Sequence, residues 1–119
     1  MDINRMIQSL KDSPRFSGMG MIVGHLGVVR GESLDGGEVT AVEVKFDELA
    51  LNKIIGDIRA MIGIIEVKVE IRWGRLKAGE DIMAVVIGGD TRQHVFPALM
   101  TAVDRIKAEA VEKKEFFKF

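Results

Sequence analysis

The sequence contains no cysteine among its 119 residues. This absence excludes a disulfide framework, a thiolate metal site and a cysteine nucleophile, and it fits a reducing cytoplasm. No apolar run approaches the roughly 18 residues that a membrane-spanning helix needs. The first residues carry acidic side chains and lack a signal-peptide cleavage pattern. We therefore expect a cytoplasmic protein that does not associate with a membrane.

Several chemical motifs are also missing. The formal net charge is −1, which does not indicate a nucleic-acid-binding surface. The two histidines, His25 and His94, are far apart in the sequence and do not have the spacing of zinc ligands. The chain has neither a dinucleotide-binding glycine motif nor a phosphate-binding loop. We therefore expect no metal and no bound cofactor, and any anion must be bound by local groups of basic residues.

The length and composition indicate one globular domain over residues 1–119, since 47% of the residues are hydrophobic and 29% are charged. Hydrophobic periodicity predicts elements in the order α-β-β-α-β-β-α. They are a helix over 2–11 capped by Asp2, strands over 20–30 and 39–46, a helix from 48 to about 62 capped by Asp47, strands over 64–74 and 82–88 joined by a turn, and a last helix that begins at Asp90. Strands grouped in pairs predict an α+β fold with a mostly antiparallel sheet and flanking helices. Ile62 and Trp73 are predicted to lie in the core.

Four basic residues are candidates for anion binding: Arg30, Arg92, Lys107 and Lys114. Arg30 follows a strand and precedes a glycine-rich loop, and Arg92 lies in the first turn of the last helix, where free N–H groups favour anions. If this helix continues to residue 114, Lys107 and Lys114 share one face and lie about 10 Å apart. Arg92 would lie about 22 Å from Lys107, so it is either unrelated or it completes a site on a second copy. Each of these residues is otherwise an ordinary surface charge.

Four ordered blocks resemble the large (catalytic) subunit family of molybdopterin synthase, the MoaE-like proteins. They are GMIVGHLGVVRG (20–31), VEVKFDELA (42–50), IRWGRLKAGE (71–80) and TRQHVFPALMTAVDRIK (91–107). The resemblance covers about residues 16 to 115, and it depends on the order and spacing of the blocks. It implies the α/β-hammerhead-like fold of that family.

The resemblance also implies an activity in molybdenum cofactor biosynthesis. Such a subunit converts cyclic pyranopterin monophosphate to molybdopterin, with sulfur from the C-terminal thiocarboxylate of a ubiquitin-like small subunit. Two large subunits form a homodimer at the centre of a heterotetramer. By resemblance Lys107 and Lys114 are catalytic, whereas Arg30, Thr91 and Arg92 bind the substrate.

The chain departs from the family at several of these positions. Thr91 replaces the histidine of a His-Arg pair, and residues 111–113 replace a proline, an apolar residue and a tryptophan. Without that proline the last helix is expected to continue through Lys114. We also expect the family's C-terminal tail, which adds a basic residue across the dimer, to be missing after Phe119.

Three interpretations of the sequence remain. The first is a working synthase subunit. The second is a non-catalytic MoaE-like module that binds a pterin or phosphate ligand, or the tail of a ubiquitin-like partner. The third is an unrelated α+β domain whose basic residues all lie on the surface. In each case the terminal FFKF segment is expected to dock on the same chain, a second copy or the partner, because three phenylalanines favour burial.

Overall fold

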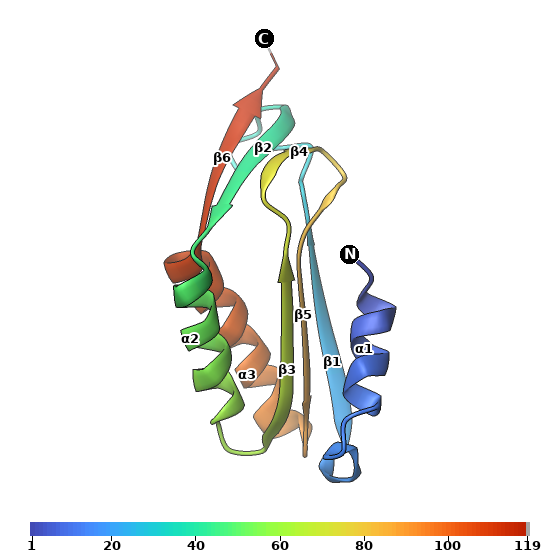
Figure 1. The fold of residues 1–119 in the computed structure, drawn as a ribbon. Helices are drawn as coiled ribbons and strands as arrows, with labels where there is room; N and C mark the ends of the chain where they lie inside the picture. Colours follow the sequence, from blue (N-terminus) through green and yellow to red (C-terminus); the bar gives the residue numbers. More distant parts are fainter. Residues whose placement is uncertain (119) are drawn as a thin grey trace.

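The computed structural model describes residues 1–118, and its body is a three-stranded antiparallel sheet in the order β1-β5-β3. These strands are β1 (Met21–Val28), β5 (Asp81–Gly89) and β3 (Ile64–Ile71). Helix α1 (Ile3–Lys11) covers one face, while α2 (Glu48–Arg59) and α3 (Arg92–Arg105) cover the other (Figure 1). With helices on both faces, the central strand β5 is buried almost throughout, which explains its unbroken apolar sequence.

A second antiparallel sheet forms an arm at one end of the body, shown at the top of Figure 1. Its order is β4-β2-β6, with β4 (Gly74–Lys77), β2 (Val39–Phe46) and β6 (Val111–Phe117). The arm makes the molecule elongated, with extents of 53 × 24 × 23 Å. The predicted α+β class with mostly antiparallel sheets is therefore confirmed.

The beginnings of the first two long helices agree with the sequence. The side chains of Asp2 and Asp47 accept hydrogen bonds from the backbone N–H groups of Arg5 and Ala50, each at 3.1 Å. Such caps satisfy N–H groups that have no partner within the helix. Helix α3 begins at Arg92, with Thr91 at the cap position in place of the predicted Asp90.

The C-terminal segment corrects the sequence prediction. Helix α3 passes through Pro97 and ends at Arg105. A π-helical turn, η2 (Ile106–Ala110), follows it, and the chain then enters β6. The predicted helix through Lys114 is wrong because residues 111–117 pair with β2, which satisfies the backbone groups of both strands.

Three smaller predictions are also wrong. Helix α2 ends at Arg59, so Ile62 lies in a turn and its side chain is 82% exposed. The side chain of Trp73 is 67% exposed and stacks on Phe46, with ring centroids 5.5 Å apart. Residues 74–77 form β4 because they pair with β2, although Gly74 was predicted to end the preceding strand and residues 75–77 to lie in a turn.

The terminal FFKF segment docks on its own chain as far as the structure describes it. Phe116 and Phe117 belong to β6, and the ring of Phe117 lies against Gly37. Phe119 lies outside the described residues. Over residues 1–118, no helix is both long enough and apolar enough to cross a membrane.

Candidate functional site

Three basic side chains line a cavity of about 290 Å³ where the arm meets the body: Arg30, Lys107 and Lys113. Its remaining walls come from β1, β5 and β6, and they are Gly27, Val28, Ile82, Met83 and Val111. The volume is close to the lower limit of small-molecule sites, about 300 Å³. An apolar wall lowers the local dielectric, so the three positive charges attract an anion more strongly than on an open surface.

Arg30 is held by the strand end that precedes it. Val29 is buried, and its backbone N–H donates to the carbonyl of Glu80 at 2.8 Å. The carbonyl of Val29 accepts from the N–H of Gly79, also at 2.8 Å. These bonds fix the backbone from which the guanidinium of Arg30 extends to the cavity.

Lys107 lies in the π turn η2, between the buried residues Ile106 and Ala110. Single π turns are rare and often occur at functional sites. The backbone carbonyl of Ala110 accepts from the N–H of Asp47 at 2.8 Å, which joins the turn to the start of α2. The residue Lys107 is exposed as a whole, but it lines the cavity.

An ion-pair network secures the same turn. Nη1 of Arg105 lies 2.8 Å from Asp57 on α2, and its Nε lies 2.8 Å from Glu109 in η2. The hydrogen bonds that Arg105 donates lower the pKa of both carboxyl groups, and these same bonds to Glu109 and Asp57 raise the pKa of the guanidinium. The network therefore stays charged at neutral pH and ties α2, α3 and η2 together.

His25 lies on β1 beside this region. Its Nε2 atom would be 3.5 Å from a Cβ added to Gly27, a cavity residue. Among the described side chains and backbone groups, none forms a hydrogen bond with this buried atom. Burial and the positive charge of Lys107 lower the pKa of His25. The imidazole is therefore neutral at pH 7 and adds no fourth positive charge.

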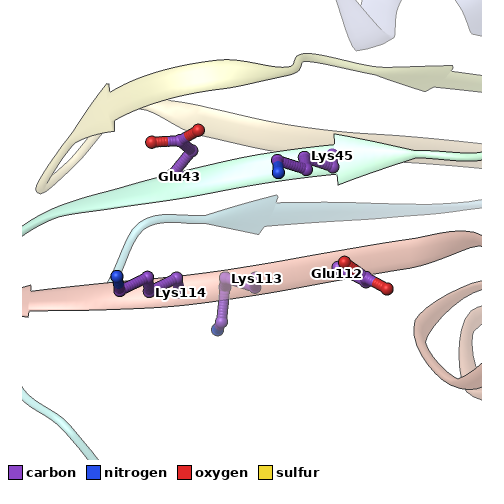
Figure 2. Close-up of a pocket in the computed structure, with 5 residues that line it drawn as sticks. All are labelled: Glu43, Lys45, Glu112, Lys113 and Lys114. Carbon is purple, nitrogen blue, oxygen red and sulfur yellow. The ribbon is translucent and has the colours of Figure 1, made fainter.

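Lys114 does not line this cavity. A separate hollow of about 300 Å³ lies along β2 and β6. Its lining residues, drawn in Figure 2, are Glu43, Lys45, Glu112, Lys113 and Lys114. Strand β6 separates the two hollows, and Lys113 lines both. The expectation that Lys107 and Lys114 share one helical face is wrong, because β6 is a strand.

Thr91 and Arg92 lie at the opposite end of α3 from Lys107 (Figure 1). The rise of a helix separates Arg92 from Lys107 by about 22 Å, so both cannot contact one small molecule within a single chain. The structure thus brings together only Arg30 and Lys107 of the five residues predicted from the sequence.

Lys113 is the cavity residue that the sequence did not indicate. The sequence pattern that could have indicated it is the alternation of side chains along residues 111–117. In a strand, this alternation puts Val111 and Lys113 on the same side. After Val111, the segment VEKKEFF carries four charged residues in a row, which have weak strand propensity and obscure this alternation.

The arrangement suits an anionic ligand better than a metal. Within residues 1–118, no group of three or more His, Asp or Glu side chains could hold a metal ion. A guanidinium binds phosphate with a fixed fork of N–H donors and keeps its charge, whereas ammonium groups act as compact donors to a developing negative charge.

A family model described as "MoaE protein" matches residues 1–109. Among solved structures, the molybdopterin biosynthesis MoaE protein from Burkholderia ambifaria is 30% identical, with a TM-score of 0.79 over 97% of this chain and 76% of that chain. Molybdopterin synthase from Staphylococcus aureus is 24% identical, with a TM-score of 0.73 over 84% of this chain and 76% of that one. A complex of subunits 1 and 2 of molybdopterin-converting factor from Helicobacter pylori contains a chain that is 16% identical, with a TM-score of 0.74 and coverage of 98% and 80%. The last two show a shared fold.

Proposed function

The chain belongs to the MoaE family, and from this membership we infer that it is the large subunit of a molybdopterin synthase, an enzyme of molybdenum cofactor biosynthesis. Residues 1–119 form one MoaE-like domain in this proposal, and the protein acts in the cytoplasm. The observation that carries the proposal is the convergence of Arg30 and Lys107 on one partly apolar cavity.

We propose that the substrate is cyclic pyranopterin monophosphate and the product molybdopterin. The sulfur comes from the C-terminal thiocarboxylate of a ubiquitin-like small subunit. The Helicobacter pylori complex of subunits 1 and 2 supports such a two-subunit arrangement. In this cavity the guanidinium of Arg30 binds the phosphate through its fixed fork of N–H donors. Once the thiocarboxylate sulfur is bonded to the substrate, water adds to the acyl carbon, and the ammonium group of Lys107 stabilises the resulting oxyanion. The acyl C–S bond then breaks, which leaves the sulfur on the substrate and a carboxylate on the small subunit.

The positions of Thr91 and Arg92 support a shared site in a homodimer. They are too far from Lys107 to act in the same chain, so a second copy supplies them. The two large subunits then form the centre of a heterotetramer, with one small subunit at each end. Closed twofold dimers are the commonest symmetric assemblies, and each such dimer contains two equivalent sites.

Two residues favour a second function, in which the protein binds a ligand without catalysis. Thr91 stands in place of a family histidine, and Lys114 lies outside the cavity. Both features favour a non-catalytic MoaE-like module that binds a pterin or phosphate ligand, or the tail of a ubiquitin-like partner. Such a module keeps the anion-binding cavity and lacks turnover.

The two functions differ in one assay. Purified protein is mixed with the thiocarboxylated small subunit and the precursor, and dithiolene formation is measured together with precursor binding. Replacing Lys107 by alanine is expected to lower the rate by at least about a hundredfold, as for the loss of an oxyanion-stabilising donor. Lys11→Ala removes an equal charge from α1, on the other face of the sheet, and is the control.

The outcomes assign the function directly. Product formed by the wild type and lost in Lys107→Ala supports the synthase. Precursor binding without any product in the wild type supports the binding module. A Lys107→Ala variant that works at the wild-type rate contradicts the proposed role of this lysine. Circular dichroism confirms in each case that the variant is folded.

A further inference from the structure

We propose that Lys113, and not Lys114, supplies the second ammonium group of the cavity and contacts the bound substrate anion. This inference rests on the proposed function and names a further substrate-binding residue for the same site. Lys114 then belongs to the outer face of the arm, where it stabilises the sheet.

The first argument is the geometry of β6. Successive side chains of a strand point to opposite faces, so Val111 and Lys113 share one face while Lys114 lies on the other. Val111 packs against the main core and lines the cavity. Lys113 follows it along the same face and lines the cavity beside Arg30 and Lys107. Figure 2 shows the side chains of Lys113 and Lys114 leaving the strand in different directions.

The second argument is the partner of each lysine across the strands. Lys114 lies opposite Glu43 in the register of β2 and β6, a pairing of opposite charges that stabilises a sheet. Its amine also lies 5.4 Å from the ring centroid of Phe116. Lys113 lies opposite Val44, which is only 1% exposed. The cross-strand position of Lys114 therefore places an opposite charge beside it, whereas that of Lys113 does not.

The third argument is electrostatic. Arg30, Lys107 and Lys113 bring three positive charges to one cavity, an arrangement that destabilises the empty site. An anionic ligand relieves this repulsion. A local conflict of this kind is typical of a binding site, and it would not arise from surface lysines placed for solubility. Lys113 thus donates hydrogen bonds to the anionic group of the substrate.

The adjacent lysines form a matched pair for the test. Lys113→Ala and Lys114→Ala remove the same charge from consecutive positions of one strand. Binding of the cyclic pyranopterin monophosphate to the large subunit is measured by calorimetry, and kcat/KM is measured with the thiocarboxylated small subunit. We expect Lys113→Ala to weaken binding by at least about tenfold, the loss of one hydrogen bond to a charged group. Lys114→Ala should bind within about twofold of the wild type, as an exposed charge screened by salt.

A third variant separates contact from a structural effect. Lys113→Arg keeps a cationic donor at the same position and is expected to regain most of the affinity that alanine loses. Thermal unfolding of all three variants identifies any loss of folding. If Lys113→Ala misfolds and cannot be measured, Lys113→Gln replaces it, because glutamine keeps most of the length of the side chain and removes its charge.

The failure of this inference is distinguishable from failure of the proposed function. If Lys107→Ala abolishes product while Lys114→Ala weakens precursor binding and Lys113→Ala does not, the function stands and the assignment of Lys113 is wrong. If the wild type forms no product but Lys113→Ala still weakens precursor binding, Lys113 is a binding residue of a non-catalytic module. Equal affinities for all variants overturn the assignment.

Discussion

At the scale of single residues, Arg30, Lys107 and Lys113 give the cavity its positive charge. The sequence predicts Arg30 and Lys107 as anion-binding residues, and both line this cavity. Lys114 was chosen because seven residues bring a helical side chain back to nearly the same face. In a strand, a shift of one residue reverses the face that a side chain occupies. Residues 111–117 form a strand, so Lys113 lines the cavity where Lys114 was predicted to do so.

His25 provides a test of pH dependence at this scale. Burial and the charge of Lys107 lower its pKa in the folded protein, whereas the unfolded chain keeps the ordinary value of 6.5. As the pH falls through 6.5, the unfolded state takes up a proton that the folded state does not yet bind. The free energy of unfolding should therefore fall from pH 7 to pH 5, until the folded imidazole is also protonated.

Urea unfolding at pH 7, 6 and 5 measures this effect, with His25→Gln as the comparison. Glutamine does not titrate, so the variant should show a shallower loss of stability over this range. Stability that depends on pH equally in both proteins would show that His25 titrates alike in the folded and unfolded states.

At the scale of elements, features that depend on local sequence could be predicted, whereas strands that form through long-range pairing could not. The caps Asp2 and Asp47 were recognised because their hydrogen bonds span three residues. Strands β4 and β6 were missed because each exists through its pairing with β2, which is distant in the sequence. The π turn that carries Lys107 connects α3 to β6, and no local sequence pattern indicated it.

The outer face of the arm allows a prediction about this pairing. Glu43 and Lys114 are direct neighbours across β2 and β6, and directly opposed opposite charges stabilise a sheet by about 0.2–1 kcal/mol. A double-mutant cycle with Glu43→Gln and Lys114→Gln, read from urea unfolding, should give a coupling free energy in that range. The coupling should decrease at 1 M salt, where charges are screened within about 3 Å. A coupling of zero at low salt would argue against the structural role of Lys114.

At the scale of the whole molecule, one chain presents an incomplete set of the predicted site residues. The cavity lies at the junction of body and arm, whereas Arg92 lies at the far end of α3. The sequence predicted this separation from helical rise alone, because the distance along a regular helix depends only on residue number. It could not predict the junction, since the arm is built from segments that are far apart in the chain.

Sites shared between two copies would allow complementation of inactive variants. Lys107→Ala and Arg92→Ala are each expected to lose activity, but a mixed dimer has one site with both native residues. If subunits exchange at random, half of the dimers are mixed, so activity should recover to about a quarter of the wild type. Product formation after mixing and re-equilibration measures this recovery. If light scattering confirms that dimers are present but the mixture recovers no activity, Arg92 lies outside the site.

The position of the cavity has a mechanical consequence. Arg30 extends from the body, and Lys113 from the last strand of the arm. A single anion held by both side chains connects the two sheets directly, so a bound ligand would resist bending of the arm against the body.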